Sequence, residues 1–357
     1  SHKLADKLTE ILIYFMVIFS PWAFGTTEPW SIWTMNITAY ALGMLLMTKW
    51  ITRFATNYNQ KPKLEINELS PKQNLLRLIQ KNCTIFLAGS MFLLLAYILT
   101  SAINARASFN FDTNEYTYFE GVNKNLPHSY NAGGTWFLFW QYLGLIILFW
   151  STRDWFAGAK PTKYSISLNP RFKRLLFVLC FSGGALALEC ILQRIYFGEF
   201  SGKLLFLIEP SINKANLNQF GPFAYRSNAA SYLNLIWPLG LGLLIELGRE
   251  NLDYGKRRIG SGPELLLIPC IFLAASGPII SSARGGALVM IGVLILIAVS
   301  MLFVKVRSKF LHFCVSAALL ASLVTAYKLG WEKIEPRLIN AFSDNMTGRT
   351  LIYETTL

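Results

Sequence analysis

Long apolar runs recur along almost the whole chain, and they constrain its fold more than any other feature. A helix needs about 20 consecutive, mostly apolar residues to cross the ~30 Å hydrocarbon core of a bilayer. On that criterion the 357-residue sequence predicts nine membrane-spanning helices. Their expected limits are 9–25, 31–50, 83–104, 134–151, 175–197, 229–248, 263–282, 285–304 and 312–330. We therefore expect an all-α, polytopic membrane protein.

The composition supports this fold class. Hydrophobic residues make up 53% of the chain and charged residues 15%, against roughly 45–50% and about 25% in an average soluble domain. The net charge of +13 could suggest nucleic-acid binding, but no basic soluble face with stacking aromatic residues accompanies it. We expect no nucleic-acid partner.

The positive charge has a topological explanation. Of the 33 Lys and Arg residues, 22 fall at the N-terminus and in segments 49–82, 152–174, 249–262 and 305–311, which lie on one side if every predicted span crosses. Short loops rich in Lys and Arg stay on the cytoplasmic side and contact anionic lipid. The N-terminus is therefore predicted to be cytoplasmic. Residues 1–330 form a transmembrane domain in this interpretation, and 331–357 begin a large loop on the opposite side.

Metal chemistry has little basis in this sequence. The five cysteines lie in or beside apolar runs without a CxxC pair, and only three histidines are present. Structural and catalytic metal sites need several such ligands at close spacing. We expect no metal ion.

Three arginines remain on the outer side once the topological charges are set aside. Arg226 precedes the sixth predicted span, Arg284 lies in the short turn Ser281–Gly286, and Arg349 opens a helix after the ninth span. A guanidinium group offers a planar fork of donors that binds phosphate oxygens in pairs, and helix N-termini attract anions. The pattern predicts a pyrophosphate site, although a single interfacial arginine can also be a simple headgroup contact.

Further candidates are few. Glu189 lies midway along the fifth span, where a carboxylate is costly unless it is paired, so it is either the partner of a buried donor or part of a substrate cavity. His128, in the outer loop 106–133, could act as a base or lie at the surface without a role. Arg194 and Asn228 complete the candidate set.

Several short segments resemble the O-antigen ligase and polymerase superfamily of bacterial envelope glycosyltransferases. They read Arg226-Ser227-Asn228, Ala283-Arg284-Gly285-Gly286 and Gly348-Arg349-Thr350-Leu351-Ile352-Tyr353. The turn 21–30 and the segment Leu192-Gln193-Arg194 are similar to further parts of these proteins. The first segment departs from the usual Asn-Pro-Asn, which leaves open whether Arg226 or Asn228 contacts the substrate.

The resemblance implies a fold of the GT-C type in the bacterial inner membrane, with the active face in the periplasm. It implies transfer of a glycan from undecaprenyl pyrophosphate to an acceptor hydroxyl, as on a lipid A core sugar, without a metal or other cofactor. Arg284 and Arg349 would stabilise the departing pyrophosphate, with Arg226 and Asn228 binding substrate. A histidine that activates the acceptor, and further helices, are expected beyond residue 357.

Other interpretations stay open. A polysaccharide polymerase or a protein O-oligosaccharyltransferase would share the donor site and differ in its acceptor, which can be a glycolipid, a glycan or a protein. A transporter of an anionic solute would show broken helices and related halves, which the sequence lacks. A noncatalytic membrane scaffold is the third alternative.

Overall fold

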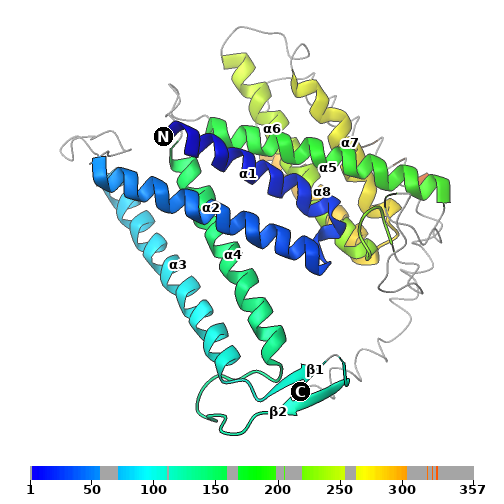
Figure 1. Ribbon diagram of the computed structural model, residues 1–357. Helices are drawn as coiled ribbons and strands as arrows, with labels where there is room; N and C mark the ends of the chain where they lie inside the picture. Colours follow the sequence, from blue (N-terminus) through cyan, green and yellow to red (C-terminus); the bar gives the residue numbers. More distant parts are fainter. Residues whose placement is uncertain are drawn as a thin grey trace. The chain divides into compact units, whose positions relative to one another are not determined.

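The structure is a computed structural model. It describes residues 2–56, 71–110, 112–158, 168–197, 205, 219–253, 263–303, 320, 324 and 327–328. These residues are mostly helical and divide into two compact units (Figure 1). Unit 1 consists of Ser1–Met16 and Glu28–Gly158, and unit 2 of Val17–Thr27 and Ala159–Leu357. Helix α1 (His2–Trp22) contributes to both units.

Unit 1 contains three further helices, in which small residues allow close packing. They are α2 (Pro29–Thr56), α3 (Pro71–Ile103) and α4 (Ala132–Ala157), and α4 packs against both of the others. A Cβ atom at Gly43 of α2 would lie 2.9 Å from Ile147 of α4, and one at Gly144 of α4 would lie 3.0 Å from the Asn36 amide oxygen of α2. These glycines let the α2 and α4 backbones approach, as small residues do between membrane helices.

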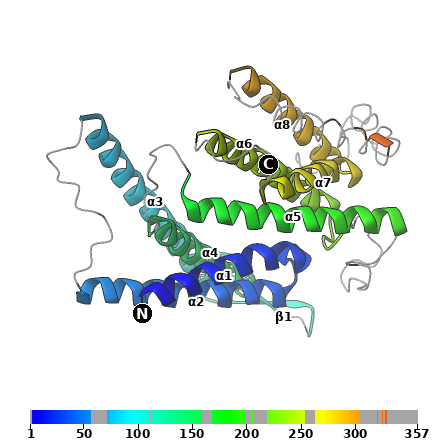
Figure 2. The ribbon, with the colours of Figure 1, turned by 90° about the horizontal axis from the view of Figure 1, so that it is seen from above.

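Four charged side chains connect α1, α2 and α4 inside unit 1. Lys49 Nζ lies 2.8 Å from Asp6 Oδ1 and 4.0 Å from Asp154 Oδ2, and the Lys49 side chain is only 1% exposed. Arg53 binds both oxygens of Asp154, at 2.6 and 3.0 Å. Figure 2 shows α1 alongside α2, the two helices that Lys49 and Asp6 join. Two cations and two anions thus form one balanced cluster.

A short hairpin interrupts the connection between α3 and α4. Strand β1 (Ala107–Asn110) pairs antiparallel with β2 (Glu115–Tyr118), with Ala107 opposite Tyr118 and Asn110 opposite Glu115. The sequence predicted only a loop over 106–133. Four-residue strands are too short for alternating polarity to stand out from a polar loop, which explains the difference.

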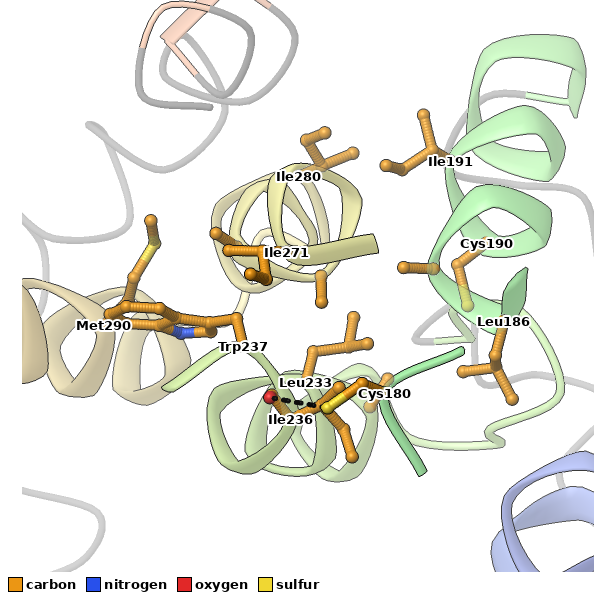
Figure 3. Packing of buried hydrophobic residues seen from close by; sticks show 14 of the residues in the cluster. Cys180, Leu186, Cys190, Ile191, Leu233, Ile236, Trp237, Ile271, Ile280 and Met290 are labelled. Atoms are coloured by element: carbon orange, nitrogen blue, oxygen red, sulfur yellow. Dashed lines mark hydrogen bonds between the residues drawn. The ribbon is translucent and has the colours of Figure 1, made fainter. Parts of the chain in front are cut away.

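Unit 2 is built around helix α7. Its elements are η1 (Phe24–Thr26), α5 (Pro170–Phe197), α6 (Arg226–Asp253), η4 (Pro263–Leu266), α7 (Leu267–Ile280) and α8 (Arg284–Phe303). Helix α7 packs against α5, α6 and α8, and every residue from 274 to 280 is buried. Figure 3 shows Ile271 and Ile280 of α7 packed among side chains of α5 and α6, such as Cys190 and Leu233.

Glycines permit the close packing of unit 2 as well. A Cβ atom at Gly183 of α5 would lie 2.7 Å from Ile236 of α6, and one at Gly184 would lie 2.6 Å from the Cβ of Cys270 in α7. Each contact leaves no space for a side chain. Side chains of α6 and α7 therefore pack directly against the α5 backbone, which strengthens dispersion contacts between the helices.

Four described helical segments are long and apolar enough to cross a membrane. They are Asn82–Ile103, Ala132–Ala157, Pro170–Tyr196 and Arg226–Arg249. They correspond to the predicted spans 83–104, 134–151, 175–197 and 229–248. The chain is therefore a predominantly helical, membrane-embedded protein.

The other predicted spans do not meet the same criteria among the described residues. Helix α1 covers most of 9–25 but begins with several charged residues, and α2 covers 31–50 but includes Asn36 and the buried Lys49. Helices α7 and α8 are present, yet their described apolar segments, Leu267–Ile280 and Arg284–Ile297, are shorter than 18 residues. The ninth span, 312–330, lies almost entirely outside the described residues.

Candidate active site

Two helix ends and two helix starts meet at one end of unit 2, which we call the arginine end. At the end of α5, the Nη2 of Arg194 donates a hydrogen bond to the carbonyl oxygen of Ser281, which follows α7, at 3.2 Å. In the third turn of α6, the side-chain amide of Asn234 donates to the carbonyl oxygen of Gly286 in the first turn of α8 at 2.8 Å. A Cβ atom at Gly286 would overlap Ala230, in the second turn of α6. The first turn of α8 is therefore in direct contact with the second and third turns of α6.

The connection between α7 and α8 is a buried three-residue turn, Ser281–Ala283. Ser281 Oγ donates to the carbonyl oxygen of Pro278 at 2.8 Å and accepts from the backbone N–H of Ala283 at 3.3 Å. Ser282 adopts a left-handed conformation with φ of 57°. The prediction of a tight hairpin at this position is confirmed. Arg284 is consequently the first residue of α8, and it is exposed.

Arg226 is the first residue of α6 and is half-buried, while Asn228, in the same first turn, is exposed. The backbone N–H of Asn228 donates to the carbonyl oxygen of Tyr225 at 3.0 Å. The first turn of a helix carries N–H groups without intrahelical acceptors and the positive end of the helix dipole. Because α6 and α8 both begin at the arginine end, their dipoles add to the charges of Arg226 and Arg284.

Arg194 is held by two contacts. Besides its bond to Ser281, its guanidinium carbon lies 5.4 Å from the centroid of the Phe220 ring, within the range of a cation–π interaction. Phe220 and Phe223 exchange backbone hydrogen bonds at 3.1 and 3.2 Å, which closes a turn before α6. Arg194 thereby joins the ends of α5 and α7 to this turn.

Glu189 lies beneath the same turn. Gly221 has a φ of 58°, and a Cβ atom there would overlap Cys190 Sγ and lie 2.7 Å from Glu189 Oε2. Both carboxyl oxygens of Glu189 are buried, and the only group among the described residues in position to donate to them is the weakly donating thiol of the neighbouring Cys190. The described residues thus supply no strong buried donor for which Glu189 would be the structural partner. The side-chain oxygens of Gln219 and Tyr232 are likewise buried without a hydrogen bond.

The end of α1 and the short helix η1 also contact this part of unit 2. The Trp22 indole N–H donates to Ser182 Oγ at 3.2 Å. Phe24, Gly25 and Thr26 all have positive φ, and a Cβ atom at Gly25 would lie 2.8 Å from the Phe223 ring. A glycine is needed at this position because of both the conformation and the contact.

Four residues of the predicted site lie at helix ends or starts of the arginine end: Arg194 in α5, Arg226 and Asn228 in the first turn of α6, and Arg284 at the start of α8. Glu189 lies under the Phe220–Phe223 turn. His128 belongs to unit 1, is half-buried and has its Nδ1 3.2 Å from the carbonyl oxygen of Leu126. Arg349 lies outside the described residues. Within the described ranges, no group of three or more His, Cys, Asp or Glu side chains could hold a metal ion.

Sequence reasoning assigned no role to Phe220, Gln219 or Tyr232. Nothing in the sequence relates Phe220 to Arg194, because their contact depends on the position of the Phe220–Phe223 turn before α6. Gln219 and Tyr232 have polar or aromatic neighbours in the sequence, so neither residue is conspicuous there. The signal that could have identified them is a polar side chain in or beside an apolar helix.

No protein-family model, curated protein or solved structure matches this chain.

Proposed function

We propose that this protein transfers a glycan from undecaprenyl pyrophosphate to an acceptor hydroxyl, in the manner of an O-antigen ligase and without a metal ion. The observation that carries the proposal is that Arg226 and Arg284 are the first residues of α6 and α8, and that Arg194 donates to the carbonyl oxygen of Ser281, three residues before Arg284, at the same end of unit 2. Guanidinium groups beside helix N-termini are a suitable environment for a pyrophosphate.

The proposed chemistry places these cations at the leaving group. The acceptor oxygen forms a bond to the anomeric carbon while the bond from that carbon to the pyrophosphate oxygen breaks, and the acceptor proton passes to a base. Negative charge accumulates on the departing pyrophosphate. Positive groups that are already in position stabilise this state more than the ground state. Arg284 and Arg349 have this role in the proposal, and Arg226 and Asn228 bind the donor.

The proposal includes nine spans, a GT-C type fold and a location in the bacterial inner membrane with the arginine end facing the periplasm. The length of α7 is compatible with this topology. Its 14 residues extend about 21 Å at 1.5 Å per residue, and the four residues of η4 add about 8 Å. Together they approach the ~30 Å hydrocarbon thickness.

The test uses the full-length protein in liposomes with a fluorescent undecaprenyl-pyrophosphate glycan. Arg226→Ala and Arg284→Ala are compared with Arg249→Ala, an exposed arginine near the opposite end of α6. We expect donor turnover to fall by about 10²-fold or more at the arginine end, as for loss of a charge-stabilising donor, and to be retained in Arg249→Ala.

Equal turnover in all three variants would refute the proposal. If the protein exchanged an anionic solute across the liposome membrane and transferred no glycan, the result would support the alternative interpretation as a transporter. The identity of the acceptor, whether lipid A core, growing glycan or protein, follows from screening acceptors with the active protein.

A further inference from the structure

The β1–β2 hairpin separates aromatic from polar side chains. In an antiparallel pair, directly opposed residues lie on the same face and successive residues alternate between faces. The register therefore places Ala107, Phe109, Tyr116 and Tyr118 on one face and Ser108, Asn110, Glu115 and Thr117 on the other. We call the first the aromatic face. The hairpin is amphipathic across its thickness.

The aromatic face is only partly covered by protein. Tyr118 is 65% exposed and Tyr116 46% exposed. The Phe109 and Tyr116 rings lie 5.0 Å apart between centroids, so they form one continuous apolar surface. Ala107 is fully buried and fixes the base of β1. The two exposed tyrosines are the part of this face available to another molecule.

The hairpin is attached at the end of a helix that can span the membrane. The backbone N–H of Ser129 donates to the carbonyl oxygen of Ser101, in the last turn of α3, at 3.3 Å. The N–H of Arg106 donates to the carbonyl oxygen of Ser129 at 2.8 Å. The hairpin base is therefore at the level where the apolar segment Asn82–Ile103 ends. In Figure 1 the strands run sideways from the ends of α3 and α4 and do not continue along the helix axes.

We propose that the aromatic face of the hairpin lies in the interfacial layer of the bilayer, with Tyr116 and Tyr118 at the level of the lipid headgroups. Tyrosine has an apolar ring and a polar tip, and it is enriched at this level. The helices on either side of the hairpin in the sequence expose apolar surface of their own, because the apolar windows of α3 and α4 are each only 6% buried within the protein.

The distribution of charge favours lipid over a sugar as the occupant. A sugar ring that stacks on an aromatic side chain also needs hydrogen-bonding groups beside that ring, because its hydroxyls must be satisfied. Here Glu115 and Asn110 lie on the opposite face. Segments that lie in the membrane interface have an apolar face on one side and a charged or polar face on the other.

The test places an environment-sensitive fluorescent amino acid at position 118 of the full-length protein, or at position 117 as the matched control on the opposite face. Both proteins are placed in vesicles of phosphatidylcholine and phosphatidylglycerol that are brominated near the headgroup end of the acyl chain. We expect quenching at 118 to exceed quenching at 117 by about threefold or more, because only the aromatic face contacts lipid.

Three outcomes would overturn the inference. Quenching that is equal at the two positions shows no preferred face, and quenching at neither shows no membrane contact. A saturable change in fluorescence at 118 on addition of a soluble oligosaccharide, without lipid quenching, identifies a sugar platform instead. Thermal unfolding is compared with the wild type beforehand, and the label moves to position 116, on the same face, if position 118 does not tolerate it.

Discussion

Replacement of Lys49 by methionine is expected to destabilise unit 1 by about 3–5 kcal/mol, the usual cost of removing one member of a buried ion pair. Lys49 Nζ is 2.8 Å from Asp6 and 4.0 Å from Asp154. At an effective dielectric constant of about 20, these separations correspond to attractions of about 6 and about 4 kcal/mol. Removing Lys49 loses these attractions but also removes the free-energy cost of burying its charge. The net destabilisation is therefore smaller than the sum of the two attractions.

The measurement is thermal and denaturant unfolding of the purified full-length protein in lipid nanodiscs. Lys124→Met is the matched control, since Lys124 is exposed in the α3–α4 connection, and we expect its effect to be within about 0.5 kcal/mol. The double variant Lys49→Met/Asp6→Asn removes both charges of the 2.8 Å pair and should recover more than half of the loss, because the negative charge that Lys49 balances is removed together with it. A cost below about 1 kcal/mol for Lys49→Met, or a double variant no more stable than the single one, would contradict the reasoning.

Three further substitutions test unit 2. Gly286→Val introduces a side chain where even a Cβ overlaps Ala230, so we expect it to separate the first turn of α8 from α6 and to lower both thermal stability and donor turnover. Asn234→Leu removes the hydrogen bond to the Gly286 carbonyl and leaves the Trp237 indole N–H without its acceptor. The loss should cost about 1–3 kcal/mol in unfolding measurements. Asn234→Asp retains the acceptor for Trp237, so comparing the two variants separates the contributions of the two hydrogen bonds. Glu189→Gln should leave the unfolding free energy within about 1 kcal/mol of wild type, because no described residue donates a strong hydrogen bond to the carboxyl group; a larger loss would reveal a structural partner.

Much of the helical framework could be predicted from the sequence because hydropathy acts over whole segments. The predicted span 83–104 differs by one residue at each end from the apolar segment Asn82–Ile103. The tight turn at Ser281–Ala283 was also predictable, since two apolar runs leave room for only a few residues between them. Arg226 and Arg284 could be placed at helix starts for the same reason.

Contacts between distant segments could not be predicted in this way. Asp6, Lys49, Arg53 and Asp154 lie near the ends of three predicted spans. There the two cations have an adequate explanation as topological signals, and charged residues just outside a span do not by themselves suggest a partner. Their pairing depends on how α1, α2 and α4 pack. The approach of Gly221 to Glu189 likewise depends on the Phe220–Phe223 turn before α6.

The short connection between α7 and α8 has a consequence for biosynthesis. In the nine-span topology that we propose, α7 and α8 both cross the bilayer, and with only Ser281–Ala283 between them they would insert as a pair. Arg284 would then be carried through the hydrocarbon region at the tip of that pair, where an arginine costs about 2.5–3.5 kcal/mol at mid-depth. Insertion of the pair would depend on the apolar residues of α8 that follow Arg284, so most of α8 would have to be synthesised before α7 reached its final depth.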